Sequence, residues 1–304
     1  MGSSQVTARA SELLSAALTE RGLVPDPRLV PALQRRARFL GTAEWNRFLR
    51  STPLGIGATH AIQLLGSGYT LVEFLAAPAA ARISDRLHAC SLGALLNLTI
   101  VVCDRLLDMG ERVENVLPRS EIPRGGGSSI VTNLMRLYHH RLAERELDDE
   151  RLGSLEKLIS QMFDAEIQTV HFGEHLPYPF WLRKCSLPVV LMGLPAWREG
   201  KRRASKLYQW HVRWLFRLGR FFGQLDDAVD LEDDLRSGEP NSWRALGREI
   251  PPSAVHRIAC SASKLLSEWD GFVDKTSEST VFRETFLHIL WGSLVPAGLH
   301  THAD

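Results

Sequence analysis

The chain has 304 residues, of which 44% are hydrophobic and 23% are charged, so it can bury a large core and is not expected to be disordered. Its 36 lysines and arginines balance 35 aspartates and glutamates, and the net charge of +1 excludes a strong overall attraction to nucleic acid or to an anionic membrane. The 4 cysteines have no Cys-x-x-Cys spacing, so we expect reduced thiols. Because the N-terminal segment lacks an apolar signal core, we expect a cytoplasmic location.

Apolar residues recur at spacings of three and four along nearly the whole chain, which predicts an all-α fold. Two uncharged stretches, residues 51–72 and 87–103, are expected to be buried helices and not transmembrane segments, because the first contains Pro53 and His60 and the second is short. No repeat or linker divides the chain, so we expect one domain over residues 1–304. The predicted helices cover residues 8–18, 29–40, 56–75, 81–109, 130–145, 150–170, 201–235, 254–269 and 281–295, with another beginning at residue 180.

Two aspartates, Asp104 and Asp108, stand near the C-terminal end of the predicted helix 81–109. Their spacing of four places both carboxylates on one helical face, one turn apart, where they repel each other unless a cation lies between them. Magnesium prefers such oxygen ligands. The alternative is a solvated helix end whose acids pair with Arg105 or Arg112.

A second acidic cluster lies at the end of the predicted helix 201–235. Asp226, Asp230, Asp233 and Asp234 recur at spacings of three and four, so a column of carboxylates follows one helical face. Acids near a helix C-terminus oppose the helix dipole, and no lysine is close in sequence to offset them. This pattern favours a divalent-metal site over a solvated acidic helix end.

An apolar wall is predicted beneath this second cluster. Phe222, Gly219 and Leu215 precede Asp226 by four, seven and eleven residues, so they share its helical face. Trp210 and Trp214 are also one turn apart, a pattern that is common in plain cores. If these rings face a cavity, they would stabilise a carbocation by cation–π attraction.

A competing zinc motif is weighed against these clusters. Residues 171–175 match the His-x-x-Glu-His pattern of inverted zinc peptidases, with His171 and His175 as the two imidazole ligands. Gly173 lies between them and Pro177 follows at once, so a helix holding both ligands is disfavoured. We therefore expect a polar helix end at this position.

Together the two acidic clusters, on separate helices of an all-α chain, resemble the aspartate-rich motifs of the class I isoprenoid synthases. This superfamily contains the trans-prenyltransferases and the class I terpene cyclases. The stretch from His88 to Asp108 is similar to the helix that leads into the first motif, and the stretch from Gln224 to Asp230 is similar to the second. The resemblance implies a helical bundle with a central active-site cavity, best supported over residues 85–240. It further implies magnesium as cofactor, about three ions, with these ligands: Asp104, Asp108, Asp226, Asp227 and Asp230.

Basic residues that would neutralise a diphosphate are implied by the same resemblance. The segment 119–125, within the long predicted loop 110–129, resembles a basic, glycine-bearing loop of the family, and such a loop could close over the site. The segment 178–187 resembles a helix whose lysine and threonine face the active site, with Cys185 in the place of the threonine. The candidate diphosphate-binding residues are Arg119, Arg124, Arg183, Lys184 and Arg236.

Departures from the family pattern shape the expected reaction. Arg105 replaces the second acid of the first motif, and no counterpart is found of the basic segment that binds a second, homoallylic diphosphate in chain-elongating enzymes. These departures predict a terpene cyclase on a prenyltransferase-like scaffold, which ionises one allylic isoprenyl diphosphate and releases diphosphate. The alternatives are a chain-elongating prenyltransferase, a head-to-head synthase and a non-catalytic subunit. The head-to-head synthases have an acidic run followed by Arg-x-Gly, and residues 231–238 resemble this pattern. A homodimer is compatible with the resemblance.

Overall fold

The computed structural model describes residues 3–49, 56–79, 83–116, 130–145, 147, 149–197, 206–246, 250–272 and 277–294. Within these ranges every regular element is a helix, which confirms the predicted all-α class. The α-helices are α1 (Ser3–Glu20), α2 (Val30–Leu49), α3 (Ala58–Ala76), α4 (Ile83–Asp108), α5 (Val113–Val116), α6 (Ile130–Ala143), α7 (Asp149–Phe172), α8 (Tyr178–Gly193), α9 (Lys206–Val229), α10 (Leu231–Ser237), α11 (Pro252–Phe272) and α12 (Ser277–Gly292). Short 3₁₀ turns are η1 (Gly173–His175), η2 (Leu194–Ala196) and η4 (Arg244–Leu246).

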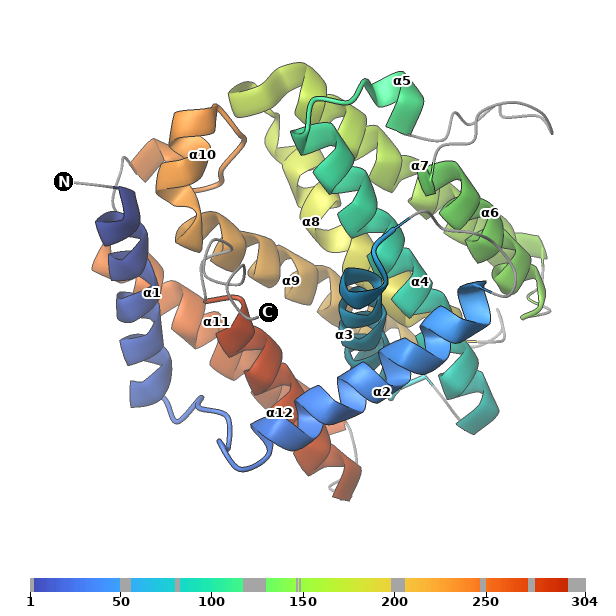
Figure 1. Ribbon diagram of the computed structural model, residues 1–304. Coiled ribbons are helices and arrows are strands. Elements are labelled where there is room, and N and C mark those ends of the chain that lie inside the picture. The colour runs from blue at the N-terminus through green and yellow to red at the C-terminus, as the bar shows by residue number, and fades with distance from the viewer. Residues whose placement is uncertain are drawn as a thin grey trace.

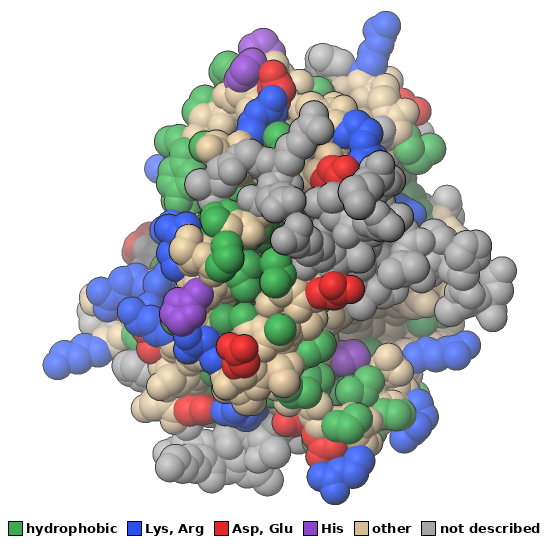
Figure 2. Space-filling view, turned by 90° about the vertical axis from the view of Figure 1, so that its left-hand side faces the viewer, with side chains coloured by type: hydrophobic (Ala, Val, Ile, Leu, Met, Phe, Trp, Pro, Cys, Tyr) green, Lys and Arg blue, Asp and Glu red, His purple; other side chains and the backbone are tan. Residues whose placement is uncertain are grey.

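The centre of the bundle is formed by α3, α4, α8 and α9 (Figure 1). α4 packs on α3, α6 and α8, and α8 packs on α7 and α9. α2 crosses the outer side of α3, and α1 packs against α11 on the far side of the bundle (Figure 1). On the face that carries α1, α10 and α11, basic and acidic side chains are interspersed, in keeping with the balanced composition (Figure 2).

The central helix α4 is long and contains an extended apolar segment. Its segment 83–107 is long and apolar enough to cross a membrane by length and composition alone. In the structure, 61% of its most apolar window is buried, with α3, α6 and α8 packed against the helix. This is the packing of a core helix, as expected from the sequence. The predicted free thiols are also found, because all 4 cysteines are unbridged.

A bend at Asp230 corrects the prediction of one continuous helix over residues 201–235. The backbone there has φ −95° and ψ 6°, and it separates α9 from α10. Glu232, Asp233 and Asp234 consequently lie in the first turn of α10, where the helix dipole stabilises negative charge. The dipole argument from the sequence therefore does not apply to these three acids. Gly238, with φ +80°, ends α10 in the left-handed conformation.

The crossing of α2 and α3 depends on two glycines. A Cβ atom at Gly41 would overlap the carbonyl oxygen of Ile62, and one at Gly66 would overlap the carbonyl oxygen of Ala37. The two backbones are therefore in direct contact at this point. Because backbone atoms cannot move aside as a flexible side chain can, a methyl group at either position forces the helices apart.

Gly66→Ala is expected to lower the free energy of unfolding by about 2 kcal/mol, because overpacking moves α2 away from the core. Gly153→Ala, at a helical position where an added Cβ meets nothing within 4 Å, is the matched control. Relief of the glycine entropy should make this control neutral or stabilising by up to about 1 kcal/mol. Urea unfolding of both variants measures the difference, and equal stabilities would contradict the direct backbone contact.

A buried histidine joins three elements of the core. His211 on α9 is fully buried, its Nε2 atom donates to the carbonyl oxygen of Leu75 at 2.8 Å, and its Nδ1 atom accepts from the Trp197 indole N–H at 2.7 Å. Both ring nitrogens are thus satisfied in the neutral form. Burial lowers the pKa of His211 to about 3, so the ring stays uncharged in the folded protein at neutral pH.

Acidification should therefore destabilise the protein through His211. The unfolded chain binds a proton on this ring below about pH 6.5, whereas the folded protein does so only near pH 3. Stability is then lost as the pH falls, by about 2 kcal/mol between pH 7 and pH 5. Denaturant unfolding at both pH values should show a smaller loss in His211→Gln, and an equal loss in both proteins would contradict this assignment.

Candidate active site

The site is built where α8 comes unusually close to α9. A Cβ atom at Gly219 would lie 2.6 Å from Ser186 Cα and 2.7 Å from the Cys185 carbonyl oxygen, and one at Gly223 would overlap the Cys185 side chain. Two glycines one turn apart thus let α8 pack directly on α9, beside the acidic end of α9. Gly219 faces α8 and Leu215 is fully buried, so the structure does not place these two residues on an open cavity wall.

Lys184 on α8 is the point at which three helices meet. Its ammonium nitrogen lies 3.5 Å from Asp104 Oδ1 on α4 and 3.5 Å from Glu166 Oε2 on α7. Burial disfavours the charge of Lys184, but Glu166 and Asp104 outweigh it and raise the pKa of Lys184. The side chain is therefore a permanent cation between the two carboxylates.

Asp226, on the second acidic helix α9, lies within electrostatic reach of Lys184 and Asp104. Its side chain is exposed, yet enough of the protein surrounds it that partial desolvation raises its pKa; the Lys184 ammonium opposes this rise and the Asp104 carboxylate adds to it. Asp230, one turn further, has its pKa raised to about 6 by burial and then by the neighbouring carboxylate of Asp226. The structure thus pairs Asp104 with Lys184, and the charges of both groups act on Asp226, with Asp230 one turn further along the chain.

Asp227 has a different environment from its neighbour Asp226. It is 9% exposed, and its Oδ2 atom accepts hydrogen bonds from the Trp181 indole N–H at 2.9 Å and from the Ser242 backbone N–H at 2.7 Å. Asn241 also donates through its amide nitrogen to the Asp227 carbonyl oxygen at 2.6 Å and to Asp234 Oδ2 at 2.7 Å. Asp227 therefore anchors the segment after α10 to α8 and α9, and burial raises its pKa to about 6.

Two other predicted basic residues, Arg183 and Arg236, have partners of their own. Arg183 stacks over the Phe180 ring, 5.6 Å from its centroid. Arg236 is 55% exposed and pairs with Asp233 at 3.0 Å and Glu232 at 3.6 Å. The remaining predicted positions, the Asp108 side chain together with Arg119 and Arg124, lie outside the described residues.

Of the aromatic residues predicted to line a cavity, only Phe222 is partly exposed. Phe222 is half-buried and contacts the rings of Phe221 and Phe286. Trp214 is 1% exposed, its indole N–H donates to the Leu265 carbonyl oxygen at 3.1 Å, and its ring lies 6.0 Å from that of Trp210. The two tryptophans are thus packed as core residues, which is the alternative that the sequence left open.

The competing zinc motif is not assembled. α7 ends at Phe172, and Gly173 follows with φ +49°. His171 and His175 therefore do not share one regular helical face. Glu174 forms a close ion pair with Arg244, which occupies the carboxylate that the motif would need as a base.

Sequence reasoning missed Glu166, Trp181 and Ser242. Glu166 follows Ile159 and Met162 on the buried stripe of α7, so a carboxylate in an apolar stripe was the available signal. Ser242 acts through its backbone N–H, which donates to the Asp227 carboxylate 15 residues away in sequence. Every residue except proline has such a donor, so the residue type at this position gave no signal.

The described acids do not form a complete metal site by themselves. Among the described residues, no group of three or more His, Cys, Asp or Glu side chains converges closely enough to hold a metal ion. Magnesium usually takes one or two carboxylates and completes its shell with water and substrate phosphates, so a full protein cage is not required. The raised pKa values of Asp226 and Asp230 reflect burial and mutual repulsion that a bound cation would relieve.

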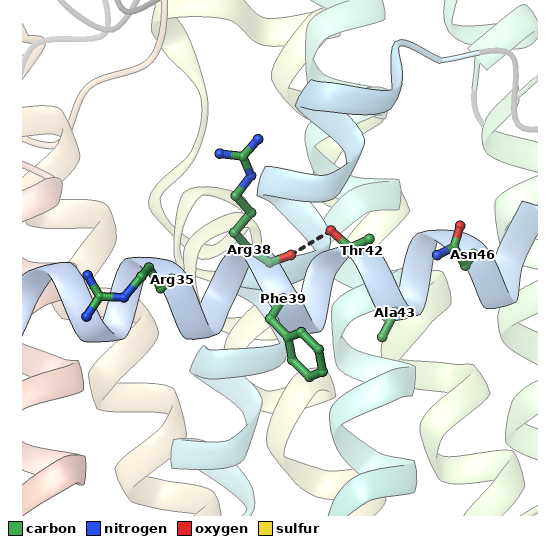
Figure 3. A pocket seen from close by; sticks show the side chains of 6 residues that line it. All are labelled: Arg35, Arg38, Phe39, Thr42, Ala43 and Asn46. Atoms are coloured by element: carbon green, nitrogen blue, oxygen red, sulfur yellow. Dashed lines mark hydrogen bonds between the residues drawn. The ribbon is translucent and has the colours of Figure 1, made fainter.

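A separate groove lies on the outer face of α2 (Figure 3). It has a volume of about 470 Å³, and Arg38 and Phe39 point to opposite sides of the helix axis in the view shown. None of the predicted site residues lines this groove, so it is not part of the candidate active site. The residues that line it are Arg35, Arg38, Phe39, Thr42, Ala43 and Asn46.

Replacing Asp226 and replacing Asp227 are predicted to change the free energy of unfolding by different amounts. Asp227→Ala should lower the free energy of unfolding by about 2 kcal/mol, because two buried N–H donors lose their acceptor. Asp226→Ala should change it by less than about 0.5 kcal/mol, because no hydrogen bond to its exposed carboxylate stabilises the fold. Urea unfolding of the two variants compares them directly, and equal losses would contradict the anchor role of Asp227.

Comparison with known proteins places the fold. No family model matches the sequence, and no curated protein sequence is similar enough to count as a match. The geranylgeranyl pyrophosphate synthase of Lactobacillus brevis superposes with a TM-score of 0.53, covering 88% of this chain and 97% of that chain at 13% identity. The geranyltransferase of Helicobacter pylori gives a TM-score of 0.49, covering 85% of this chain and 96% of that chain at 16% identity. The first superposition establishes the fold, and the chain has the all-α fold of the isoprenoid synthases.

Proposed function

We propose that the protein is a magnesium-dependent enzyme acting on an allylic isoprenyl diphosphate, and that its reaction is prenyl transfer. The observation that carries this proposal is the ion pair of Lys184 with Asp104 at 3.5 Å, together with the electrostatic influence of both groups on Asp226 of a second acidic helix. Carboxylates and an ammonium group in one place suit a metal-bound diphosphate. The fold is shared with a geranylgeranyl pyrophosphate synthase, which supports the chain-elongating alternative over the cyclase that the sequence favoured.

In the proposed function, different residues of the site bind magnesium, bind the diphosphate and fix the geometry of α9. Asp104, Asp226 and Asp230 would hold magnesium, which when bound stabilises negative charge on the departing diphosphate. Lys184 would contact a diphosphate oxygen, because it is a fixed cation beside these acids. Asp227 serves the site indirectly, by fixing the end of α9 against Trp181 and Ser242.

The carbocation must be shielded from water after the diphosphate leaves. Phe222 precedes Asp226 by one helical turn, is half-buried and contacts the ring of Phe286, so it is a candidate to shield the cation. An aromatic face close to a desolvated cation contributes up to about 2 kcal/mol. The substrate chain would therefore extend from the acids along α9.

A terpene cyclase is the second candidate, and one observation favours it. Arg105, which stands in place of the second acid of the first motif, points to His60 at 2.9 Å and provides no carboxylate. Together with the missing basic segment for a homoallylic diphosphate, this suits an enzyme with one substrate.

Product analysis separates these functions. The purified protein is incubated with magnesium and geranyl, farnesyl or geranylgeranyl diphosphate, each with and without isopentenyl diphosphate. Longer isoprenyl diphosphates that form only with both substrates are expected, and EDTA should abolish them. Cyclic hydrocarbon from an allylic substrate alone would establish the cyclase instead. Release of no diphosphate in any mixture would contradict catalysis and favour a non-catalytic subunit.

Asp226→Asn is expected to reduce kcat about a hundredfold or more, because a group that stabilises the departing charge through metal is removed. The folded state should be retained, since this carboxylate is exposed. Asp270→Asn on α11, an acid outside both acidic motifs, serves as the control and should keep full activity. A folded Asp226→Asn variant with unchanged turnover would contradict the metal assignment.

A further inference from the structure

Glu166 is the buried partner of Lys184, and its position differs in kind from that of Asp104. The Glu166 side chain is 9% exposed, whereas that of Asp104 is 48% exposed, although each carboxylate lies 3.5 Å from the same ammonium nitrogen. Charges interact more strongly where water is excluded, so the attraction between Lys184 and Glu166 is less screened than that between Lys184 and Asp104. Lys184 is thus held from the interior side by α7 and is open on the other side.

The second observation is the competition for Lys184 among the acids of the site. Asp104 and Asp226 both lie within electrostatic reach of its ammonium group, and both are needed as metal ligands in the proposed function. A lysine that paired fully with either acid would neutralise a ligand and weaken metal binding. Glu166, at the same distance of 3.5 Å on the interior side, shares the ammonium group with Asp104, so Lys184 does not pair with Asp104 alone.

We infer that Glu166 is a positioning residue of the active site, whose buried carboxylate holds the Lys184 ammonium group beside Asp104 as an anion-binding group. This inference rests on the proposed function, because it concerns the diphosphate subsite of the same site. In this inference Glu166 acts on the diphosphate subsite through Lys184.

Binding of inorganic diphosphate, measured by titration calorimetry on the full chain in magnesium chloride, tests the inference without turnover. Glu166→Gln keeps the size of the side chain and removes its charge, and it should raise the Kd for diphosphate about tenfold. Lys184→Gln should weaken binding by a similar factor. In the Lys184→Gln background the further change Glu166→Gln should alter the Kd less than about twofold, because its target is already gone.

Glu44→Gln is the matched control for loss of a buried glutamate charge. Glu44 is 2% exposed, pairs with Arg47 at 2.7 Å and accepts from Ser91 at 2.8 Å, on the α2 side of the bundle. This variant should leave the Kd for diphosphate unchanged even if it lowers the melting temperature. The double variant of Lys184 and Glu166 leaves neither charge uncompensated, so it tests the coupling even if Glu166→Gln alone folds poorly.

The outcomes separate the inference from the function on which it rests. If the unmodified protein binds no diphosphate with magnesium, both are overturned. If it binds diphosphate and Glu166→Gln binds equally well, the function stands and the inference fails. If Glu166→Gln weakens binding by the same factor with and without Lys184, the two residues act independently and the inference also fails.

Discussion

The ammonium group of Lys184 is the interaction on which the arrangement of the site depends. It lies 3.5 Å from carboxylates on two different helices, and its charge also acts on Asp226 of a third. Without a cation at this point, the carboxylates of Asp104 and Glu166 would be close to each other without a balancing charge and would repel. One positive charge therefore allows acids from α4 and α7 to lie at the same point of the bundle.

At the site, α8 and α9 are also closer than ordinary side chains allow. Gly219 and Gly223 remove the Cβ atoms that would meet the backbone and side chain of Cys185. The same device, with Gly41 and Gly66, brings α2 against α3 at a distance from the site. Glycines in this bundle thus set the distance between packed helices. The charged residues near the helix ends then determine the chemistry of the site.

The sequence predicted the helices well, because apolar periodicity is a local pattern. It did not predict the bend at Asp230, since no proline or glycine marks it and the backbone change is confined to one residue. It also treated Asp226 and Asp227 alike. Adjacent helical residues point about 100° apart, so one carboxylate meets solvent and Lys184 while the other meets Trp181 and Ser242. Contacts of this kind, and the pairing of Glu166 with Lys184, depend on how distant helices pack.

The altered first motif is explained by the same division between ligands and anchors. Arg105 follows Asp104 by one residue, so it leaves the α4 surface in another direction, and its guanidinium group meets His60 at the start of α3, 2.9 Å away. The position has exchanged a carboxylate for a contact that fixes the end of α4 against α3. In the proposed function, a first motif with one acid fewer would depend more on substrate oxygens to complete a metal shell, so metal and diphosphate are expected to bind together more than separately.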